Sequence, residues 1–324
     1  MSINRSAALA GALAVGLTLA APRAGAQSVA PAFAGTYTLN DLGTIGGIIG
    51  GYGGLTFLDA NTLLVGARTP GAIYSVPVVR NSLGSITAFG APSQFASAPD
   101  IDAGLSFGTG NVLFYTAFSN NLLGQIEAGS AGPDRTVDLD GLAGTDVLGR
   151  VGGLGFVPGG RPGAGNFRLL SFESGNLYAS FLNPDGDGTF DVSVFFVETL
   201  GGGARGLGWV PLGAALFPNP SILVTEFTSG DVAAYETDVN GDPILATRRT
   251  LVSGITDGNA GTTVDPVTGD FLFSTFGLGA GEARILQVTT STVPEPSSLA
   301  LAATGLLAVG ALARRRRGRR EHAR

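Results

Sequence analysis

Apolar and polar residues alternate over short distances between residues 30 and 290, and glycine, proline, asparagine and aspartate repeatedly interrupt the apolar stretches. This pattern is typical of short β-strands that are joined by tight turns. No stretch in this range has the 3.6-residue periodicity and the capping residues of a helix. We therefore predict that this part of the chain is all-β.

A four-residue signature recurs along the same range: glycine, an apolar residue, any residue, and an aromatic or apolar residue. Four clear copies and a weaker fifth copy begin 50, 49, 53 and 55 residues apart, at Gly54, Gly104, Gly153, Gly206 and Gly261. A fixed period of this length indicates a repeat architecture in which each unit is one supersecondary element.

Each signature is followed by further predicted strands. The second strands are expected at Thr62–Ala67, Val112–Phe118, Phe167–Phe172, Ser221–Phe227 and Asp270–Phe276. The third strands are expected at Ala72–Val79, Leu122–Glu127, Leu177–Leu182, Val232–Thr237 and Arg284–Thr289. The first four repeats have a fourth strand, at Ser85–Phe89, Arg135–Leu139, Asp191–Thr199 and Thr247–Val252. Four antiparallel strands in a unit of this size predict a β-propeller blade.

The fifth repeat lacks a fourth strand. The segment Gly35–Gly43 precedes the first repeat and has the length and alternation of the missing strand. We therefore predict a five-bladed β-propeller whose ring is closed by this N-terminal strand, which removes an exposed sheet edge. A six-bladed ring stays an alternative because the fifth copy is degenerate, and a β-sandwich or β-solenoid of similar composition is a further one.

The amino-acid composition limits the kinds of catalytic and metal sites that the protein can contain. Glycine accounts for 52 of 324 residues, which fits inner strands crowded around a central channel. The chain contains no cysteine and no lysine, and its single histidine, His322, lies near the C-terminus. These absences exclude disulfides, thiol nucleophiles and Cys/His zinc sites, and they disfavour a Ser-His-Asp triad. Any catalysis must rest on carboxylate, arginine, tyrosine or serine side chains.

Residues 1–26 are predicted to be a secretory signal peptide. Arg5 supplies the positive start, Ala7–Ala21 is apolar, and Ala24-Gly25-Ala26 fits the small-residue cleavage rule. The mature chain is then expected to begin at Gln27, with an uncleaved N-terminal anchor as the alternative.

The C-terminal residues 293–324 contain three features in order. Pro294, Glu295 and Pro296 come first, followed by an apolar run at 297–313 that is long enough for a short membrane helix. A basic run follows, beginning with Arg314, Arg315, Arg316 and Arg317. Arginine clusters stay on the cytoplasmic side of a membrane, so the preceding domain is expected to face outward.

This order of features closely resembles the PEP-CTERM sorting signal of Gram-negative bacteria. The resemblance implies recognition and cleavage of an inner-membrane precursor by an exosortase. It also implies release to the cell surface or extracellular matrix, usually alongside exopolysaccharide. A plain C-terminal anchor is the alternative. The predicted organisation is therefore a signal peptide at 1–26, a propeller at 27–292 and a sorting signal at 293–324.

Charge is unevenly distributed between these parts. Residues 27–292 contain 23 acidic residues and 10 arginines, which gives the propeller a net charge of −13. An acidic domain with scattered arginines disfavours nucleic acid as a partner.

In a propeller, the loops that enter the inner strands meet at one mouth of the central channel. The charged and polar residues expected there are Asp100, Asp102, Arg150, Arg205, Asp257 and Asn259. Such a set is suited to bind a cation, a sugar or an acidic group. If the protein is a glycoside hydrolase, Asp100, Asp102 and Asp257 are the candidate acid, base or nucleophile. The alternative is that these aspartates only form turns.

A second candidate is the segment 183–191, in which oxygen-bearing side chains alternate and a glycine follows the third position. Asn183, Asp185, Asp187 and Asp191 resemble the first half of a calcium loop. The twelfth position is Val194, where a complete loop needs a glutamate. The same residues also suit a plain hairpin turn, so calcium and a simple turn both stay open.

We predict an exported protein with a non-catalytic binding or structural role at the cell surface, linked to exopolysaccharide. The alternatives are a secreted propeller hydrolase or lyase that acts on carbohydrate through the channel-mouth carboxylates, and a calcium-stabilised adhesion module.

Overall fold

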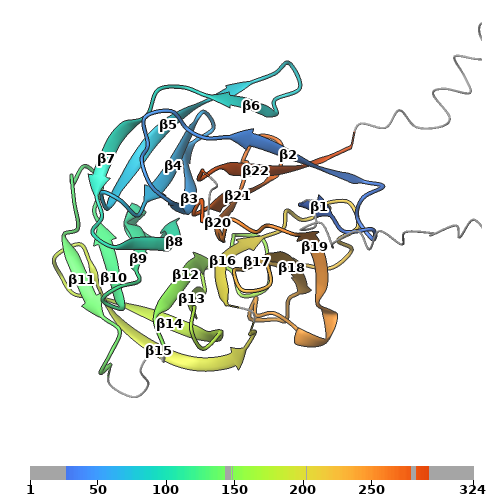
Figure 1. The fold of residues 1–324 in the computed structure, drawn as a ribbon. Coiled ribbons are helices and arrows are strands. Elements are labelled where there is room, and N and C mark those ends of the chain that lie inside the picture. Colours follow the sequence, from blue (N-terminus) through green and yellow to red (C-terminus); the bar gives the residue numbers. More distant parts are fainter. Residues whose placement is uncertain (1–26, 143–146, 148, 202, 279–281, 292–324) are drawn as a thin grey trace, which may run out of the picture.

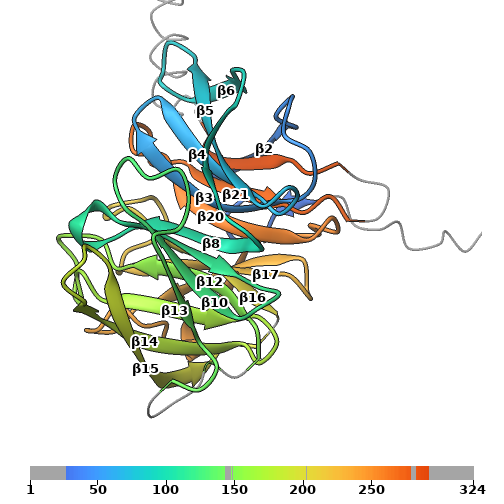
Figure 2. The same cartoon turned by 90° about the vertical axis from the view of Figure 1, so that its left-hand side faces the viewer.

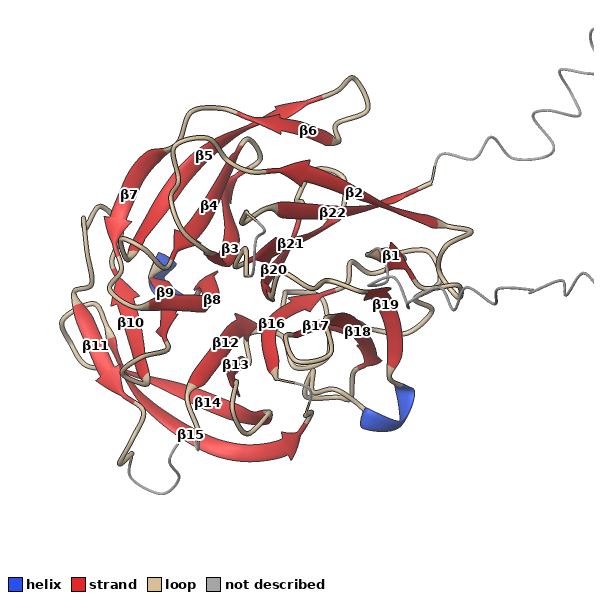
Figure 3. Ribbon diagram, viewed as in Figure 1, coloured by secondary structure: helices blue, strands red, loops and turns tan. Residues whose placement is uncertain are grey.

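The computed structural model describes residues 27–142, 147, 149–201, 203–278 and 282–291. Five antiparallel sheets are arranged as blades around a central axis (Figure 1). Apart from two short 3-10 turns, Thr109–Asn111 and Leu245–Thr247, all regular structure in the described ranges is β (Figure 3). The predicted all-β, five-bladed β-propeller is confirmed, and the six-bladed ring is excluded.

Blades 2 and 3 each contain four strands, counted from the inside outward. Blade 2 consists of β8 (Ile101–Phe107), β9 (Leu113–Ala117), β10 (Leu122–Ile126) and β11 (Arg135–Asp138). Blade 3 consists of β12 (Val151–Phe156), β13 (Phe167–Ser171), β14 (Asn176–Pro184) and β15 (Phe190–Thr199).

Blades 4 and 5 are both extended by the N-terminal segment. Blade 4 consists of β16 (Ala204–Trp209), β17 (Ser221–Glu226), β18 (Asp231–Glu236) and β19 (Arg249–Ser253), followed by the two-residue strand β1 (Ser28–Val29). Blade 5 consists of β20 (Asn259–Val264), β21 (Phe271–Thr275), β22 (Ile285–Thr290) and β2 (Tyr37–Gly43).

Blade 1 differs from the simple pattern. It contains β3 (Tyr52–Asp59), β4 (Thr62–Ala67) and the long strand β5 (Ala72–Arg80), which has two outer partners. The first half of β5 pairs with β7 (Ser93–Ser97) and its second half with β6 (Ile86–Phe89). Only the latter was predicted, because the serine- and proline-rich sequence around β7 does not look like a strand.

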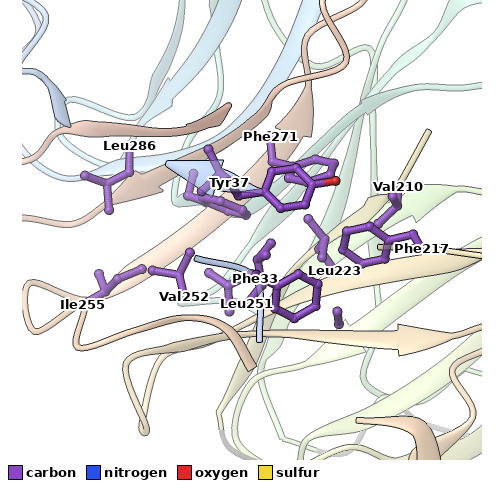
Figure 4. Close-up of a cluster of buried hydrophobic side chains, with 14 residues drawn as sticks. Phe33, Tyr37, Val210, Phe217, Leu223, Leu251, Val252, Ile255, Phe271 and Leu286 are labelled. Atoms are coloured by element: carbon purple, nitrogen blue, oxygen red, sulfur yellow. The ribbon is translucent and has the colours of Figure 1, made fainter. Parts of the chain in front are cut away.

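The ring is closed as predicted. Strand β2 pairs antiparallel with β22, from Tyr37 opposite Thr290 to Gly43 opposite Ile285. The segment before it also adds β1 to the edge of blade 4. Between the two strands, Phe33 is fully buried in the hydrophobic cluster that joins blades 4 and 5 (Figure 4). The N-terminal segment therefore holds two neighbouring blades together as well as closing the ring.

The hydrophobic core is divided into clusters between neighbouring blades. In β4, Leu63 and Val65 pack in the cluster between blades 5 and 1, whereas Leu64 packs in the cluster between blades 1 and 2. Successive side chains of a strand point to opposite faces, and both faces of an inner strand are covered. This explains why the second strands are continuous apolar runs in the sequence.

The signature glycines lie where the inner strands approach one another around the channel. A Cβ atom on Gly206 would lie 2.6 Å from the carbonyl oxygen of Ala260 in the next blade. The ladder between β16 and β17 is interrupted at this point, and the hydroxyl of Thr225 accepts the Gly206 N–H and donates to the Ala260 carbonyl. Thr116 and Ser274 make the equivalent links from blades 2 and 5, so side-chain hydroxyls tie adjacent inner strands together.

No helix within the described ranges is long and apolar enough to cross a membrane. The predicted signal peptide at 1–26 and membrane helix at 297–313 both lie outside those ranges.

Candidate functional site at the channel mouth

Four phenylalanines surround the end of the channel at which the inner strands begin. Each one is the residue directly after the second strand of its blade, and the four are Phe118, Phe172, Phe227 and Phe276. Neighbouring rings meet edge to face, with centroids 5.6, 5.4 and 6.3 Å apart around the mouth. In blade 1 the equivalent position holds Arg68, whose guanidinium lies 5.5 Å from the Phe118 ring.

Arg205 occupies the centre of this phenylalanine ring. Its guanidinium carbon lies 4.0 Å from the Phe172 centroid and 4.6 Å from those of Phe227 and Phe276. The residue is only 3% exposed, so its charge is removed from water. A guanidinium over an aromatic face is attracted by the ring quadrupole, and this attraction strengthens when water is excluded.

Asp102 is the charge partner of Arg205. Its Oδ1 accepts a hydrogen bond of 3.0 Å from Nη1 of Arg205, although the two residues are contributed by blades 2 and 4. Burial raises the pKa of Asp102, and the positive charges of Arg205 and Arg68 oppose that rise. Burial likewise lowers the pKa of Arg205. Asp102 Oδ2 and Arg205 Nε have no hydrogen-bond partner.

Asp100 and Arg150 lie at the rim and are bound locally. Asp100 has a positive φ of 58° and accepts a hydrogen bond of 2.7 Å from the side-chain amide of Asn120. Arg150 donates to the backbone carbonyl of Ser119 and lies 3.7 Å from the carboxylate of Glu173. Both residues therefore hold the loops that precede the inner strands.

Asp257 and Asn259 also have local partners, in blades 4 and 5. The carboxylate of Asp257 lies 3.1 Å from Nε of Arg284 and accepts from the Thr275 hydroxyl. Asn259 is fully buried and donates 2.6 Å to the carbonyl of Asp231, whereas its Oδ1 has no partner.

Of the six residues expected at the mouth, the structure thus brings Asp102 and Arg205 into direct contact. It gives Asp100, Arg150, Asp257 and Asn259 separate partners. Sequence reasoning missed the phenylalanine ring, although its signal was present: a phenylalanine recurs at the same place after the second strand of four repeats.

The predicted calcium segment forms the hairpin between β14 and β15. The guanidinium of Arg135, from blade 2, lies 2.6 Å from Asp185 and also pairs with Asp191. Asp185 further accepts from the Thr189 hydroxyl and the Asp187 N–H, and these contacts lower the pKa of Asp185 to about 2.

Asn183 lies directly opposite Asp191 in the β14–β15 ladder. Within the described part of the chain, no three or more His, Cys, Asp or Glu side chains are grouped in a way that could hold a metal ion. Calcium at this hairpin stays a prediction, and an ion there would have to displace the positive charge of Arg135.

The clearest similarity to known proteins is at the C-terminus. A family model described as the PEP-CTERM protein-sorting motif matches residues 292–317. The match begins directly after Ser291, the last described residue of the fold. It contains the Pro294-Glu295-Pro296 triplet, the apolar run and Arg314 to Arg317. None of the curated protein sequences matches the chain significantly.

Several solved structures are weakly similar to this chain over most of its length. A gluconolactonase from Xanthomonas campestris is 12% identical, with a TM-score of 0.46 over 82% of this chain and 95% of that chain. A streptogramin B lyase is 11% identical, with a TM-score of 0.44 over 79% of this chain and 98% of the lyase.

The PQQ-bound aldose sugar dehydrogenase from Streptomyces coelicolor is 14% identical, with a TM-score of 0.41 over 79% of this chain and 98% of that chain. At these values the likeness carries no argument about chemistry. The chain is thus a five-bladed β-propeller that carries a PEP-CTERM protein-sorting motif.

Proposed function

We propose that this protein is an exported propeller with a non-catalytic binding or structural role at the cell surface or in the extracellular matrix, linked to exopolysaccharide. The sorting motif implies an exported protein that is anchored and then processed by an exosortase-type enzyme. The inner membrane of a Gram-negative cell is the proposed site of that processing.

The non-catalytic assignment is supported by one observation: each candidate carboxylate at the channel mouth is already bound to another side chain. Carboxylate catalysis on a glycoside needs two carboxyl groups that flank one bond, either about 5–5.5 Å or about 6.5–9.5 Å apart. Here Asp102 is buried against Arg205, Asp100 is bound to Asn120, and Asp257 is bound to Arg284. The Arg205 guanidinium packs between the phenylalanine rings beside these carboxylates.

Catalysis is tested by incubating the purified exported protein with neutral and acidic polysaccharides and measuring new reducing ends and unsaturated products. We expect no turnover, and Asp257→Asn should behave like the wild type. Turnover that is lost in Asp257→Asn would establish the hydrolase or lyase alternative instead.

Sorting is tested by replacing Pro294, Glu295 and Pro296 with alanine in a host that contains an exosortase. We expect the full-length precursor to accumulate in the membrane, because the recognised triplet is absent. A control variant, Thr290→Ala with Ser291→Ala, alters the two residues just before the motif and should be processed normally. Unchanged processing of the triple variant would argue against the sorting assignment.

A further inference from the structure

A groove of about 710 Å³ lies between the outer parts of blades 5 and 1. One wall is formed by β2 and β22, the two strands that close the ring. The other wall is the hairpin of β5 and β6, which projects from the rim of the propeller (Figure 2). None of the residues that line the groove belongs to the set described above at the channel mouth.

The first wall presents hydrogen-bonding side chains because of the alternation in β2. Tyr37 and Leu39 point toward blade 4 and pack in the core, so Thr38 and Asn40 point the other way, into the groove. Thr38 lies opposite Thr289 in the β2–β22 ladder, and the Asn40 side-chain amide donates 3.3 Å to the Thr289 hydroxyl.

The second wall is fixed to blade 5. Arg80, at the end of β5, binds both carboxylate oxygens of Asp265, at 2.6 and 2.9 Å, and Asp265 is 1% exposed. The hairpin tip also rests on blade 5, since a Cβ atom on Gly84 would lie 3.3 Å from the Val267 side chain. The two walls are therefore held at a fixed separation, which lowers the entropic cost of binding.

The lining of the groove is almost uncharged. Its single ionisable residue is Asp270, which is buried and accepts a hydrogen bond from Gln287. The remaining polar groups are hydroxyls and amides, and two exposed aliphatic side chains, Leu83 and Val267, stand among them. This combination matches a neutral sugar chain, which presents hydroxyl groups at its edges and C–H groups on its faces.

The charge of the domain argues against an acidic ligand. Residues 27–292 carry a net charge of −13, so a polyanion is repelled at long range. Arg80, which directly precedes the groove residue Asn81, is already neutralised by Asp265.

We propose that this groove binds a segment of a neutral polysaccharide through the hydroxyl and amide side chains of β2, β22 and β6. The proposal rests on the proposed function and assigns it a site and a ligand class.

The test measures binding of the full exported protein to a panel of neutral glucans, galactans and mannans, with alginate and polygalacturonate as acidic comparisons. One variant, Asn40→Ala with Thr289→Ala, removes an amide and a hydroxyl from the first wall. A second, Ser85→Ala with Thr87→Ala, alters only the hairpin and leaves the ring closure intact. The control, Gln94→Ala with Thr136→Ala, removes an amide and a hydroxyl from exposed positions on β7 and β11.

We expect the wild type and the control to bind a neutral glycan with equal affinity. Each groove variant should bind it with an affinity lower by a factor of about ten or more. If the first variant fails to fold, the second decides. Undiminished binding by the groove variants would overturn the groove assignment while leaving the proposed function intact. Binding of acidic polysaccharides alone would overturn the ligand class, and no binding to any polysaccharide would overturn both proposals.

Discussion

Arg205 and Asp102 are charged residues that the fold has removed from water. Two ions lose a large hydration energy on burial, and their mutual attraction, the positive charge of Arg68 and the surrounding phenylalanine rings offset that loss. A variant that keeps only one of these two charges is therefore expected to be less stable than the wild type.

Arg205→Ala should therefore lower the free energy of unfolding by about 3–5 kcal/mol, since it leaves the Asp102 carboxylate buried without its ion-pair partner. Asp102→Leu combined with Arg205→Met should cost less, because it leaves no lone charge. Arg150→Ala is the matched control and should change the free energy by at most about 1 kcal/mol, because that arginine is exposed. Urea unfolding measures all three, and equal losses for Arg205→Ala and Arg150→Ala would contradict the argument.

Glu198, on β15, is another residue whose surroundings disfavour its charged form. Burial, followed by the negative charges of Asp242 and Asp238, raises the pKa of Glu198 to about 7. Its Oε1 has no hydrogen-bond partner. The folded state binds the proton more tightly than the unfolded chain, so stability falls as the pH rises through about 7 and recovers as the pH falls toward 4.5.

Glu198→Gln should accordingly raise the melting temperature at pH 8 and leave it almost unchanged near pH 5. Asp187→Asn serves as the control, because that side chain is exposed on the β14–β15 hairpin. Thermal melts of both variants across this pH range check the prediction. An increase for Glu198→Gln that is the same at both pH values would show that the carboxyl group does not titrate as expected.

At the scale of elements, the inner strands depend on hydroxyl groups as well as on apolar packing. Thr225 links Gly206 of its own blade to Ala260 of the next blade, at the point where the ladder between β16 and β17 is interrupted. Without that hydroxyl, a buried N–H and a buried carbonyl both lose their partner.

Thr225→Val, which keeps the shape of the side chain, should therefore reduce the free energy of unfolding by about 2–4 kcal/mol. The same change at Thr136, which is exposed on β11, should stay within about 0.5 kcal/mol. Chemical denaturation distinguishes the two, and a Thr225→Val variant as stable as Thr136→Val would refute this role for the hydroxyl.

Most of the strands were predictable because their signals are local. The repeated glycine signature marks close approach of the inner strands, and the apolar runs mark strands that are covered on both faces. The ring closure was also predictable, since the fifth repeat lacks a strand that the N-terminal segment can supply.

The contacts of the candidate site were not predictable in the same way. Asp102 and Arg205 are 103 residues apart, and Arg135 lies 50 residues from Asp185. These pairs depend on how whole blades are placed around the axis, and local sequence motifs carry no information about such contacts. For the same reason, the sequence suggested open carboxylates at the mouth and an open oxygen cluster in the hairpin.

At the scale of the whole molecule, negative and positive charges are concentrated in different parts of the chain. The net charge of −13 belongs to residues 27–292, and the arginine run lies within or beyond the sorting motif. An acidic domain without lysine is well suited to remain soluble outside the cell.

The ring closure has a mechanical consequence. Strand β2 covers the outer edge of β22, so β22, the last described strand before the sorting motif, lies between two neighbours, β2 and β21. While the chain is tethered beyond Ser291, tension enters the fold at the end of this strand. A strand flanked on both sides resists such a pull along its axis by loading two hydrogen-bonded ladders in shear at once, whereas an edge strand loads only one. The N-terminal segment therefore reinforces the point at which the domain is held.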